Sequence, residues 1–166
     1  MGMAPDAGVV TLLRFEVPHV EATGLFAQRL APLLRAGDVI ALKGELGAGK
    51  TAFARALIHA LGAVDREVPS PTFTLAQSYE GRALGIWHFD LYRLKSADEA
   101  LELGIDEMGC DSVVLIEWPE RLGAALASDR LEITFEYCAE DDARRITLGG
   151  LNGWSDRLAD LQINES

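Results

Sequence analysis

The chain has 166 residues, of which 49% are hydrophobic and 25% are charged, as in ordinary globular proteins with one well-formed core. Acidic residues outnumber Lys and Arg by 26 to 15, and the formal net charge is −11. This balance argues against a large nucleic-acid-binding surface on the chain itself, because contacts to phosphates require clustered basic residues. We expect a flexible tail at residues 1–8, a single domain at residues 9–166, no membrane segment, no signal peptide and a cytoplasmic location.

Hydrophobic periodicity predicts the first two elements. Alternating apolar and charged residues predict a strand from Val10 to Val17. Apolar residues at helical spacing predict a helix from Glu21 to Leu34. Within this helix, Thr23 is a candidate N-cap, and Pro32 is expected to bend or end the helix.

The next segment is Gly44-Glu-Leu-Gly-Ala-Gly-Lys-Thr51, which matches the phosphate-binding pattern G-x-x-x-x-G-K-[ST]. A short apolar strand is predicted before it at Asp38–Lys43, and an amphipathic helix after it at Lys50–Leu61, with Gly62 as a candidate C-cap. Strand, glycine loop and helix together place phosphates at a helix N-terminus, where free N–H groups and the helix dipole favour anions. The predicted nucleotide-binding residues are Glu45, Leu46, Gly47, Ala48, Gly49, Lys50, Thr51 and Ala52.

Two prolines stiffen the segment Val68–Leu75, so that Ser70–Thr74 is either a surface turn or a switch that senses the γ-phosphate. A β-hairpin is predicted with arms at Thr74–Tyr79 and Ala83–Phe89. A helix with acidic residues in its first turn is predicted from Ser96 to about Gly104.

The run Ser112-Val-Val-Leu-Ile-Glu117 predicts a buried strand that delivers a carboxylate to a magnesium site. Thr51 and Glu117 are the predicted metal ligands, and Asp90 and Glu117 the predicted catalytic residues. Asp90 is otherwise a turn residue or a partner of Arg93. His88 is either a general base or a packed histidine.

Trp118 either stacks on a base, lies in a partner interface or is a half-buried core residue. A terminal hairpin is predicted from Leu131–Tyr137 and Arg145–Leu148, followed by a short helix at Trp154–Ile163. Cys110 and Cys138 are expected to be reduced, half-buried thiols.

Four motifs together resemble the TsaE (YjeE) family of bacterial P-loop ATPases, in the family's order and approximate spacing over residues 39–148. They are Gly44–Thr51, Ser70-Pro-Thr-Phe-Thr74, His88-Phe-Asp-Leu-Tyr-Arg93 and Val114-Leu-Ile-Glu-Trp118. The resemblance implies an α/β P-loop NTPase-like fold in one domain, with a mostly parallel central sheet flanked by helices and added antiparallel hairpins.

The resemblance also implies a function. Members of this family act with TsaB and TsaD in threonylcarbamoyl transfer to adenosine 37 of tRNAs that read ANN codons, with ATP and Mg²⁺ as cofactors and tRNA contacted mainly through the partners. By similarity, Lys50 holds phosphates, Thr51 and Glu117 attend Mg²⁺, and Asp90 belongs to the catalytic cluster. Many members carry a second hydroxyl residue where this chain has Ala52, which we expect to soften nucleotide affinity by about 1 kcal/mol.

Three other functions stay open from the residues alone. A small-molecule or nucleotide kinase would need an acceptor site and an arginine-bearing lid, which the sequence does not make obvious. A GTPase commonly carries Asn-Lys-x-Asp, and neither Asn152 nor Asn164 is followed by lysine. A nucleotide-dependent assembly factor would use ATP to set partner affinity, with hydrolysis incidental.

Overall fold

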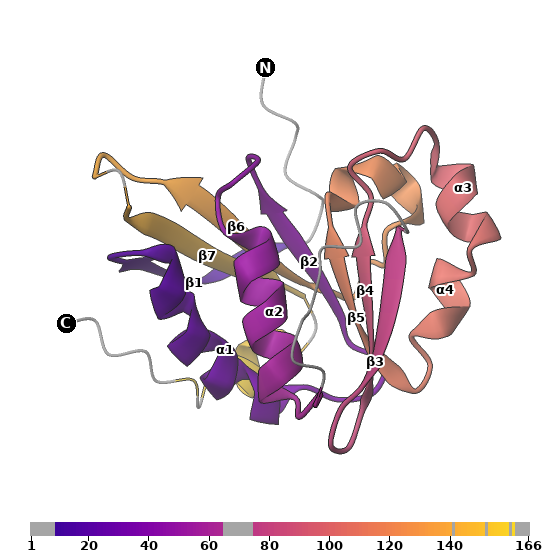
Figure 1. The fold of residues 1–166 in the computed structure, drawn as a ribbon, viewed down its shortest axis with the longest axis horizontal. Coiled ribbons are helices and arrows are strands. Elements are labelled where there is room, and N and C mark those ends of the chain that lie inside the picture. The colour runs from indigo at the N-terminus through magenta and orange to yellow at the C-terminus, as the bar shows by residue number, and fades with distance from the viewer. Residues whose placement is uncertain (1–8, 65–74, 141, 152, 160, 162–166) are drawn as a thin grey trace.

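A computed structural model describes residues 9–64, 75–140, 142–151, 153–159 and 161 of the chain. The described residues form a seven-stranded sheet in the order β1-β7-β6-β2-β5-β4-β3 (Figure 1). The strands are β1 (Val10–Val17), β2 (Val39–Gly44), β3 (Ala76–Glu80), β4 (Gly85–Asp90), β5 (Ser112–Glu117), β6 (Leu131–Tyr137) and β7 (Arg144–Gly150).

The strand directions confirm the predicted α/β class. The four central strands β6, β2, β5 and β4 run parallel to one another. Antiparallel strands extend both edges: β3 pairs with β4, while β7 pairs with β6 and β1 pairs with β7. β5 is buried along its whole length, as expected for a central parallel strand covered on both faces.

Helices cover both faces of the sheet. Their bounds are η1 (Val20–Ala22), α1 (Thr23–Leu30), η2 (Ala31–Leu33), α2 (Lys50–Ala60), α3 (Ala97–Glu102), α4 (Ile105–Met108), η3 (Pro119–Ala125) and α5 (Trp154–Leu158), where η denotes a 3₁₀ helix. α1 and α2 lie side by side against the sheet, and α3 and α4 lie beyond β4 and β3 (Figure 1).

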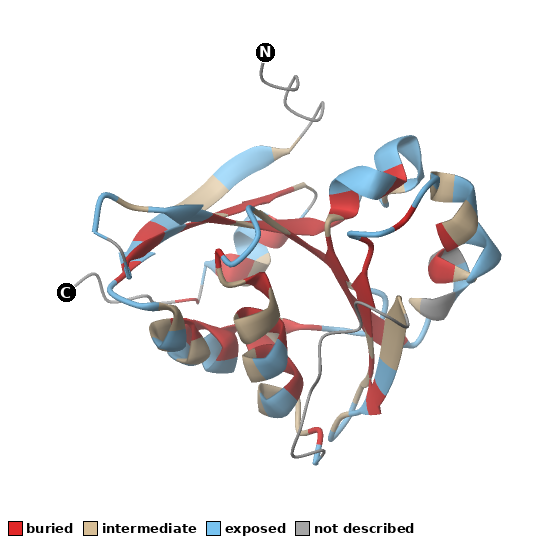
Figure 2. Cartoon of the chain, turned by 45° about the horizontal axis from the view of Figure 1, so that its top comes forward, coloured by how far each residue is buried: buried red, intermediate tan, exposed pale blue. Residues whose placement is uncertain are grey.

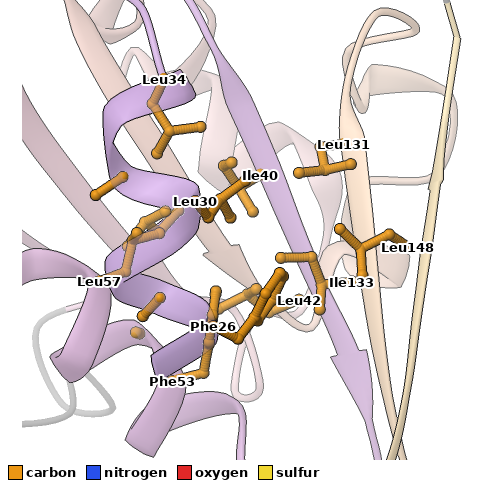
Figure 3. Packing of buried hydrophobic residues seen from close by; sticks show 14 of the residues in the cluster. Phe26, Leu30, Leu34, Ile40, Leu42, Phe53, Leu57, Leu131, Ile133 and Leu148 are labelled. Carbon is orange, nitrogen blue, oxygen red and sulfur yellow. The ribbon is translucent and has the colours of Figure 1, made fainter. Parts of the chain in front are cut away.

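The larger hydrophobic core lies between α1, α2 and the sheet (Figure 3). Phe53 of α2 is fully buried, and its ring packs against Phe26 of α1 and Phe135 of β6. A second core of eight buried residues, among them Phe89 and Leu122, lies on the other face beneath α3, α4 and η3. Buried positions therefore follow the central strands and the inner sides of α1 and α2, whereas α3 exposes most of its outer surface (Figure 2).

The parallel centre brings one set of strand ends together. β2 ends at Gly44, β4 at Asp90 and β5 at Glu117. In the sheet register Leu42 pairs with Glu117 and Asp90 pairs with Glu117. The predicted loop and both predicted acids therefore lie at the same edge of the sheet, which is where ligands bind in open α/β sheets.

The predicted helix from Glu21 to Leu34 is wrong as one continuous element. It is divided into η1, α1 and η2, and Pro32 lies inside η2. Because proline lacks an N–H group and clashes with the preceding turn, it bends or ends an α-helix, and α1 does end at Leu30, two residues before Pro32, as expected of this proline. Thr23 is not the N-cap either, since its hydroxyl donates back to the carbonyl of Val20 at 2.6 Å and Ala22 occupies the cap position.

Other boundaries differ in smaller ways. Ser96 occupies the N-cap position of α3, but its side chain makes no capping hydrogen bond. α5 ends at Leu158, five residues before the predicted end at Ile163, although part of that stretch lies outside the described residues. η3 and α4 were not predicted. The proposed tail at residues 1–8 and the candidate switch Ser70–Thr74 also lie outside the described residues.

Among the described residues, no helix is both long enough and apolar enough to cross a membrane.

Candidate functional site: a phosphate loop beside two buried acids

The glycine-rich loop connects β2 to α2, as the motif predicts. Gly49 is the N-cap of α2 and has φ of 122°, in the region that side chains disfavour. At Gly44 a Cβ atom would lie 2.6 Å from the carbonyl oxygen of Phe135, so only glycine lets β6 approach the end of β2 this closely. The loop therefore opens onto the N-terminus of an eleven-residue helix, an arrangement suited to anions.

Lys50 begins α2 and is almost entirely buried, at 4% exposure. Its ammonium group donates a hydrogen bond to the carbonyl of Gly44 and lies 3.4 Å from the centre of the Trp118 ring. Burial lowers the pKa of Lys50, while the negative charges of Glu117, Glu120 and Asp90 act in the opposite direction. A negatively charged ligand at this loop would compensate the buried ammonium group directly.

Glu117 is held on both of its carboxylate oxygens. The Thr51 hydroxyl donates to Oε1 at 2.8 Å, and Nε2 of His88 lies 2.7 Å from Oε2. His88 and Glu117 have exposures of 0% and 2%. A buried carboxylate requires such partners, because an unpaired charge away from water is strongly disfavoured. Thr51, Glu117 and His88 thus form one connected chain from α2 through β5 to β4.

Asp90 ends the strand next to Glu117 and is also buried. Its Oδ1 accepts the backbone N–H of Tyr92 at 3.0 Å, and its own N–H donates to the carbonyl of Leu75 at 3.0 Å. The alternative interpretation of Asp90 as a turn residue therefore describes part of its role. Its register position beside Glu117 still places a second carboxylate at the site.

The donor set at this position fits a magnesium ion. Thr51 Oγ1 and Glu117 Oε1 are two adjacent oxygen atoms, the ligand type that Mg²⁺ prefers. In the part of the chain that the structure describes, no group of three or more His, Cys, Asp or Glu side chains has an arrangement that could hold a metal ion by itself. Mg²⁺ is usually held by one or two protein oxygens together with phosphate and water, so the pair Thr51 Oγ1 and Glu117 Oε1 is of the size that this ion needs.

An open cavity of about 640 Å³ adjoins the loop. Its lining comes from the loop, from the segment after β5 and from β6, and includes Glu45, Leu46, Trp118 and Tyr137. Trp118 is half-buried and has a left-handed backbone conformation, with φ of 60°. This turn sends its ring toward Lys50, and Tyr92 packs on it with ring centroids 5.0 Å apart.

A family model described as "Threonylcarbamoyl adenosine biosynthesis protein TsaE" matches residues 17–146 of this chain. The chain belongs to the TsaE family. The resemblance inferred from the four motifs is thereby confirmed.

Two proteins named as TsaE are similar in sequence to this chain over most of its length. A protein from Streptomyces coelicolor named tRNA threonylcarbamoyladenosine biosynthesis protein TsaE is 42% identical over 140 residues, which is 82% of this chain and 94% of that protein. The Bacillus subtilis protein of the same name is 38% identical over 136 residues, covering 81% and 84% of the two chains. The crystal structure of Bacillus subtilis YdiB superposes with a TM-score of 0.74 at 31% identity, covering 92% of this chain and 94% of that one. The fold of this TsaE-family chain is that of a P-loop NTPase.

The structure brings together most of the predicted site residues. Lys50, Thr51 and Glu117 are in one cluster with Asp90 alongside, whereas Glu45 and Leu46 face outward at the tip of the loop. Cys110 is exposed rather than half-buried, and both cysteines are free.

Sequence reasoning missed the role of His88 as a partner of Glu117, and it missed Tyr137 and Arg144, whose side chains contact the loop from the terminal hairpin. The only available signal for His88 was its position two residues before Asp90, on the same face of one strand. Nothing in the sequence indicated the hairpin contacts.

Proposed function

We propose that this chain is the ATP-binding and ATP-hydrolysing subunit of a system that makes threonylcarbamoyladenosine in tRNA. In this proposal it acts with TsaB and TsaD, which transfer the threonylcarbamoyl group to adenosine 37 of tRNAs that read ANN codons. The family name supports the pathway. The partners and the tRNA position follow from the resemblance of the four motifs.

The observation that carries the ATPase part is the contact between Thr51 and Glu117. A phosphate loop alone supports binding, whereas hydrolysis also needs a carboxylate beside the loop hydroxyl. Here the two groups lie 2.8 Å apart although 66 residues separate them in the chain. The fold therefore links the loop to a buried acid at the end of a parallel strand.

Each residue has a role that its chemistry supports. Lys50 and the N–H groups of the loop bind the phosphates of ATP, and Lys50 exchanges its contact with the Gly44 carbonyl for a phosphate oxygen. Thr51 and Glu117 would hold Mg²⁺, which when bound neutralises charge that develops on the phosphates. Asp90 orients the attacking water. The buried setting of both acids excludes bulk water and strengthens these interactions.

The charge of the chain is consistent with dependence on partners. Acidic residues outnumber basic residues by 26 to 15, which gives a net charge of −11 and little positive surface for tRNA phosphates. The tRNA is therefore contacted mainly by the other subunits. An acidic protein associates readily with a basic surface. We place the complex in the cytoplasm, where tRNA is modified, and we expect hydrolysis to be slow until the partners bind.

The test compares three substitutions in the isolated protein and in a mixture with purified TsaB–TsaD. Lys50→Ala is expected to abolish ATP binding, because it removes the charge at the phosphates. Glu117→Ala is expected to bind ATP and to hydrolyse it about 100-fold more slowly. Lys95→Ala changes an exposed lysine elsewhere and serves as the matched control. The assays measure ATP binding, ATP hydrolysis and multiple-turnover tRNA modification.

The results separate this proposal from its alternatives. No stimulation of wild-type hydrolysis by TsaB–TsaD would count against the proposal. Normal multiple-turnover modification with the Glu117→Ala protein would instead indicate an assembly factor in which hydrolysis is incidental. A phosphorylated small-molecule product would indicate a kinase.

A further inference from the structure

The end of the β6–β7 hairpin contacts the phosphate loop at two backbone carbonyls. The hydroxyl of Tyr137, the last residue of β6, donates to the carbonyl of Leu46 at 2.9 Å. Nε of Arg144, the first residue of β7, donates to the carbonyl of Ala48 at 3.2 Å. Tyr137 and Arg144 are separated from the loop by about 90 residues of sequence, so this is a tertiary contact made by the fold. We call these two residues the hairpin pair.

The direction of a carbonyl determines the direction of the next N–H group. In a trans peptide the C=O and the following N–H point to opposite sides, and the described residues contain no cis peptide. The carbonyls of Leu46 and Ala48 point toward the hairpin pair, so the N–H groups of Gly47 and Gly49 point away from it.

We infer that the hairpin pair are positioning residues for nucleotide binding: they hold two peptide planes of the loop so that the Gly47 and Gly49 N–H groups face the phosphates. This inference rests on the proposed function, since it requires that phosphates bind at the loop. Gly47 has φ of 81° and Gly49 has φ of 122°, conformations from which a glycine peptide rotates at little steric cost. An external hydrogen bond to each plane removes that freedom before the ligand arrives, and such preorganisation increases affinity.

The two residues of the hairpin pair also contact each other. Tyr137 and Arg144 are directly opposite each other in the β6–β7 register, and the Arg144 guanidinium lies 4.3 Å from the centre of the Tyr137 ring. Arg144 is buried, at 8% exposure, and also donates to the carbonyl of Ala143 at 3.0 Å. A guanidinium so far from solvent is retained only where acceptors satisfy it, and one of its acceptors is a loop carbonyl.

The hairpin is in turn aligned with the strand that carries the loop. β6 pairs in parallel with β2, and Phe135 lies opposite Gly44 at the point where the loop begins. Tyr137 follows Phe135 by two residues and therefore points to the same face of the sheet. The register of β6 on β2 thus sets where the hairpin pair meets the loop.

The test uses Tyr137→Phe, which deletes one hydroxyl, and Arg144→Met, which keeps the aliphatic stem and removes the donors. Arg145→Met is the matched control, because Arg145 is the adjacent residue, points to the opposite face and is paired at the surface with Glu16. A non-hydrolysable ATP analogue is titrated into each protein. We expect Kd to rise about 5-fold for Tyr137→Phe and on the order of 20-fold for Arg144→Met, and to stay within about 2-fold for Arg145→Met.

Two further measurements separate positioning from a general loss of structure. In steady-state hydrolysis, KM should rise with Kd while kcat stays within about 2-fold, because the contacts of the hairpin pair go to carbonyls of the loop, whereas the Thr51 hydroxyl and His88 hold the Glu117 carboxylate. In amide NMR spectra, Tyr137→Phe should move the Gly47 resonance and leave that of Gly85, at the start of β4, in place.

The outcomes distinguish this inference from the proposed function. If the wild-type and Lys50→Ala proteins bind the analogue equally, or if neither binds it, the proposed function fails. If the wild-type protein binds, Lys50→Ala does not, and Tyr137→Phe binds as tightly as wild type, the inference about the hairpin pair is overturned. If circular dichroism shows that the Arg144→Met protein is unfolded, the result for Tyr137→Phe decides alone. The Tyr137 hydroxyl lies at an exposed rim, so that its removal leaves the core intact.

Discussion

His88 Nε2 lies 2.7 Å from Glu117 Oε2, and the two side chains are 0% and 2% exposed. With Glu117 ionised, Nε2 must carry the hydrogen and donate it. The other ring nitrogen of His88 has no hydrogen-bond partner among the described residues. One oxygen of Glu117 is thus held by His88, which leaves Oε1 for Thr51. His88 is therefore placed to orient the acid rather than to act as a base on its own.

We predict that replacing His88 separates this orienting role from simple packing. Gln extends its amide nitrogen about as far as Nε2 of histidine, whereas the shorter Asn does not reach that position. Hydrolysis at saturating ATP should stay within about 3-fold for His88→Gln and fall by about 10- to 100-fold for His88→Asn, with nucleotide affinity little changed. Single-turnover hydrolysis with partners present provides the measurement. An equal loss in both variants would indicate a packing role only.

The Thr51 hydroxyl should be needed for the effect of Mg²⁺ on nucleotide binding. Thr51→Val keeps the shape of the side chain but removes the oxygen that contacts Glu117. We expect Mg²⁺ to strengthen ADP binding in the wild type and in Thr51→Ser, and to do so at least about 10-fold less in Thr51→Val. Calorimetric titrations with Mg²⁺ and with EDTA measure this difference. If Thr51→Val weakened ADP binding by the same factor in EDTA as in Mg²⁺, the hydroxyl would not be acting through the metal.

Arg157 should anchor α5 to the start of β2. Its two terminal nitrogens donate to the two carboxylate oxygens of Asp38 at 2.8 and 2.6 Å, and both side chains are mostly buried. Such bidentate charged pairs are among the stronger hydrogen bonds. We expect Arg157→Met and Asp38→Asn each to lower the free energy of unfolding by about 2 kcal/mol. A double-mutant cycle in urea should show coupling of at least about 1 kcal/mol, and additive effects would contradict the pairing.

Phe53 should be a main determinant of stability. It is fully buried, and its ring centroid lies 5.3 Å from that of Phe26 and 5.6 Å from that of Phe135. Phe53→Ala is expected to lower the free energy of unfolding by about 3–5 kcal/mol, through lost burial and the cavity left behind. Leu25→Ala, at a helix position that is 63% exposed, should change it by less than about 0.5 kcal/mol. Urea denaturation followed by circular dichroism measures both.

The sequence alone determined the features that depend on local spacing. Alternation predicted β1 at Val10–Val17 with correct bounds, and the apolar run before Glu117 predicted β5. The glycine pattern located the loop between β2 and α2. A strand, a tight loop and a helix each depend on residues that are neighbours in the chain, so local patterns can predict them. The order of four short motifs was also sufficient to indicate the TsaE family.

Only the tertiary structure decided which of these residues meet. The parallel register of β4 and β5 places His88 and Asp90 beside Glu117, and the packing of α2 brings Thr51 to the same carboxylate. Strand order and register depend on pairing across the whole sheet, which no local pattern specifies. For the same reason, the contacts of Tyr137 and Arg144 with the loop could not be predicted: they exist because β6 lies next to β2 in the folded sheet.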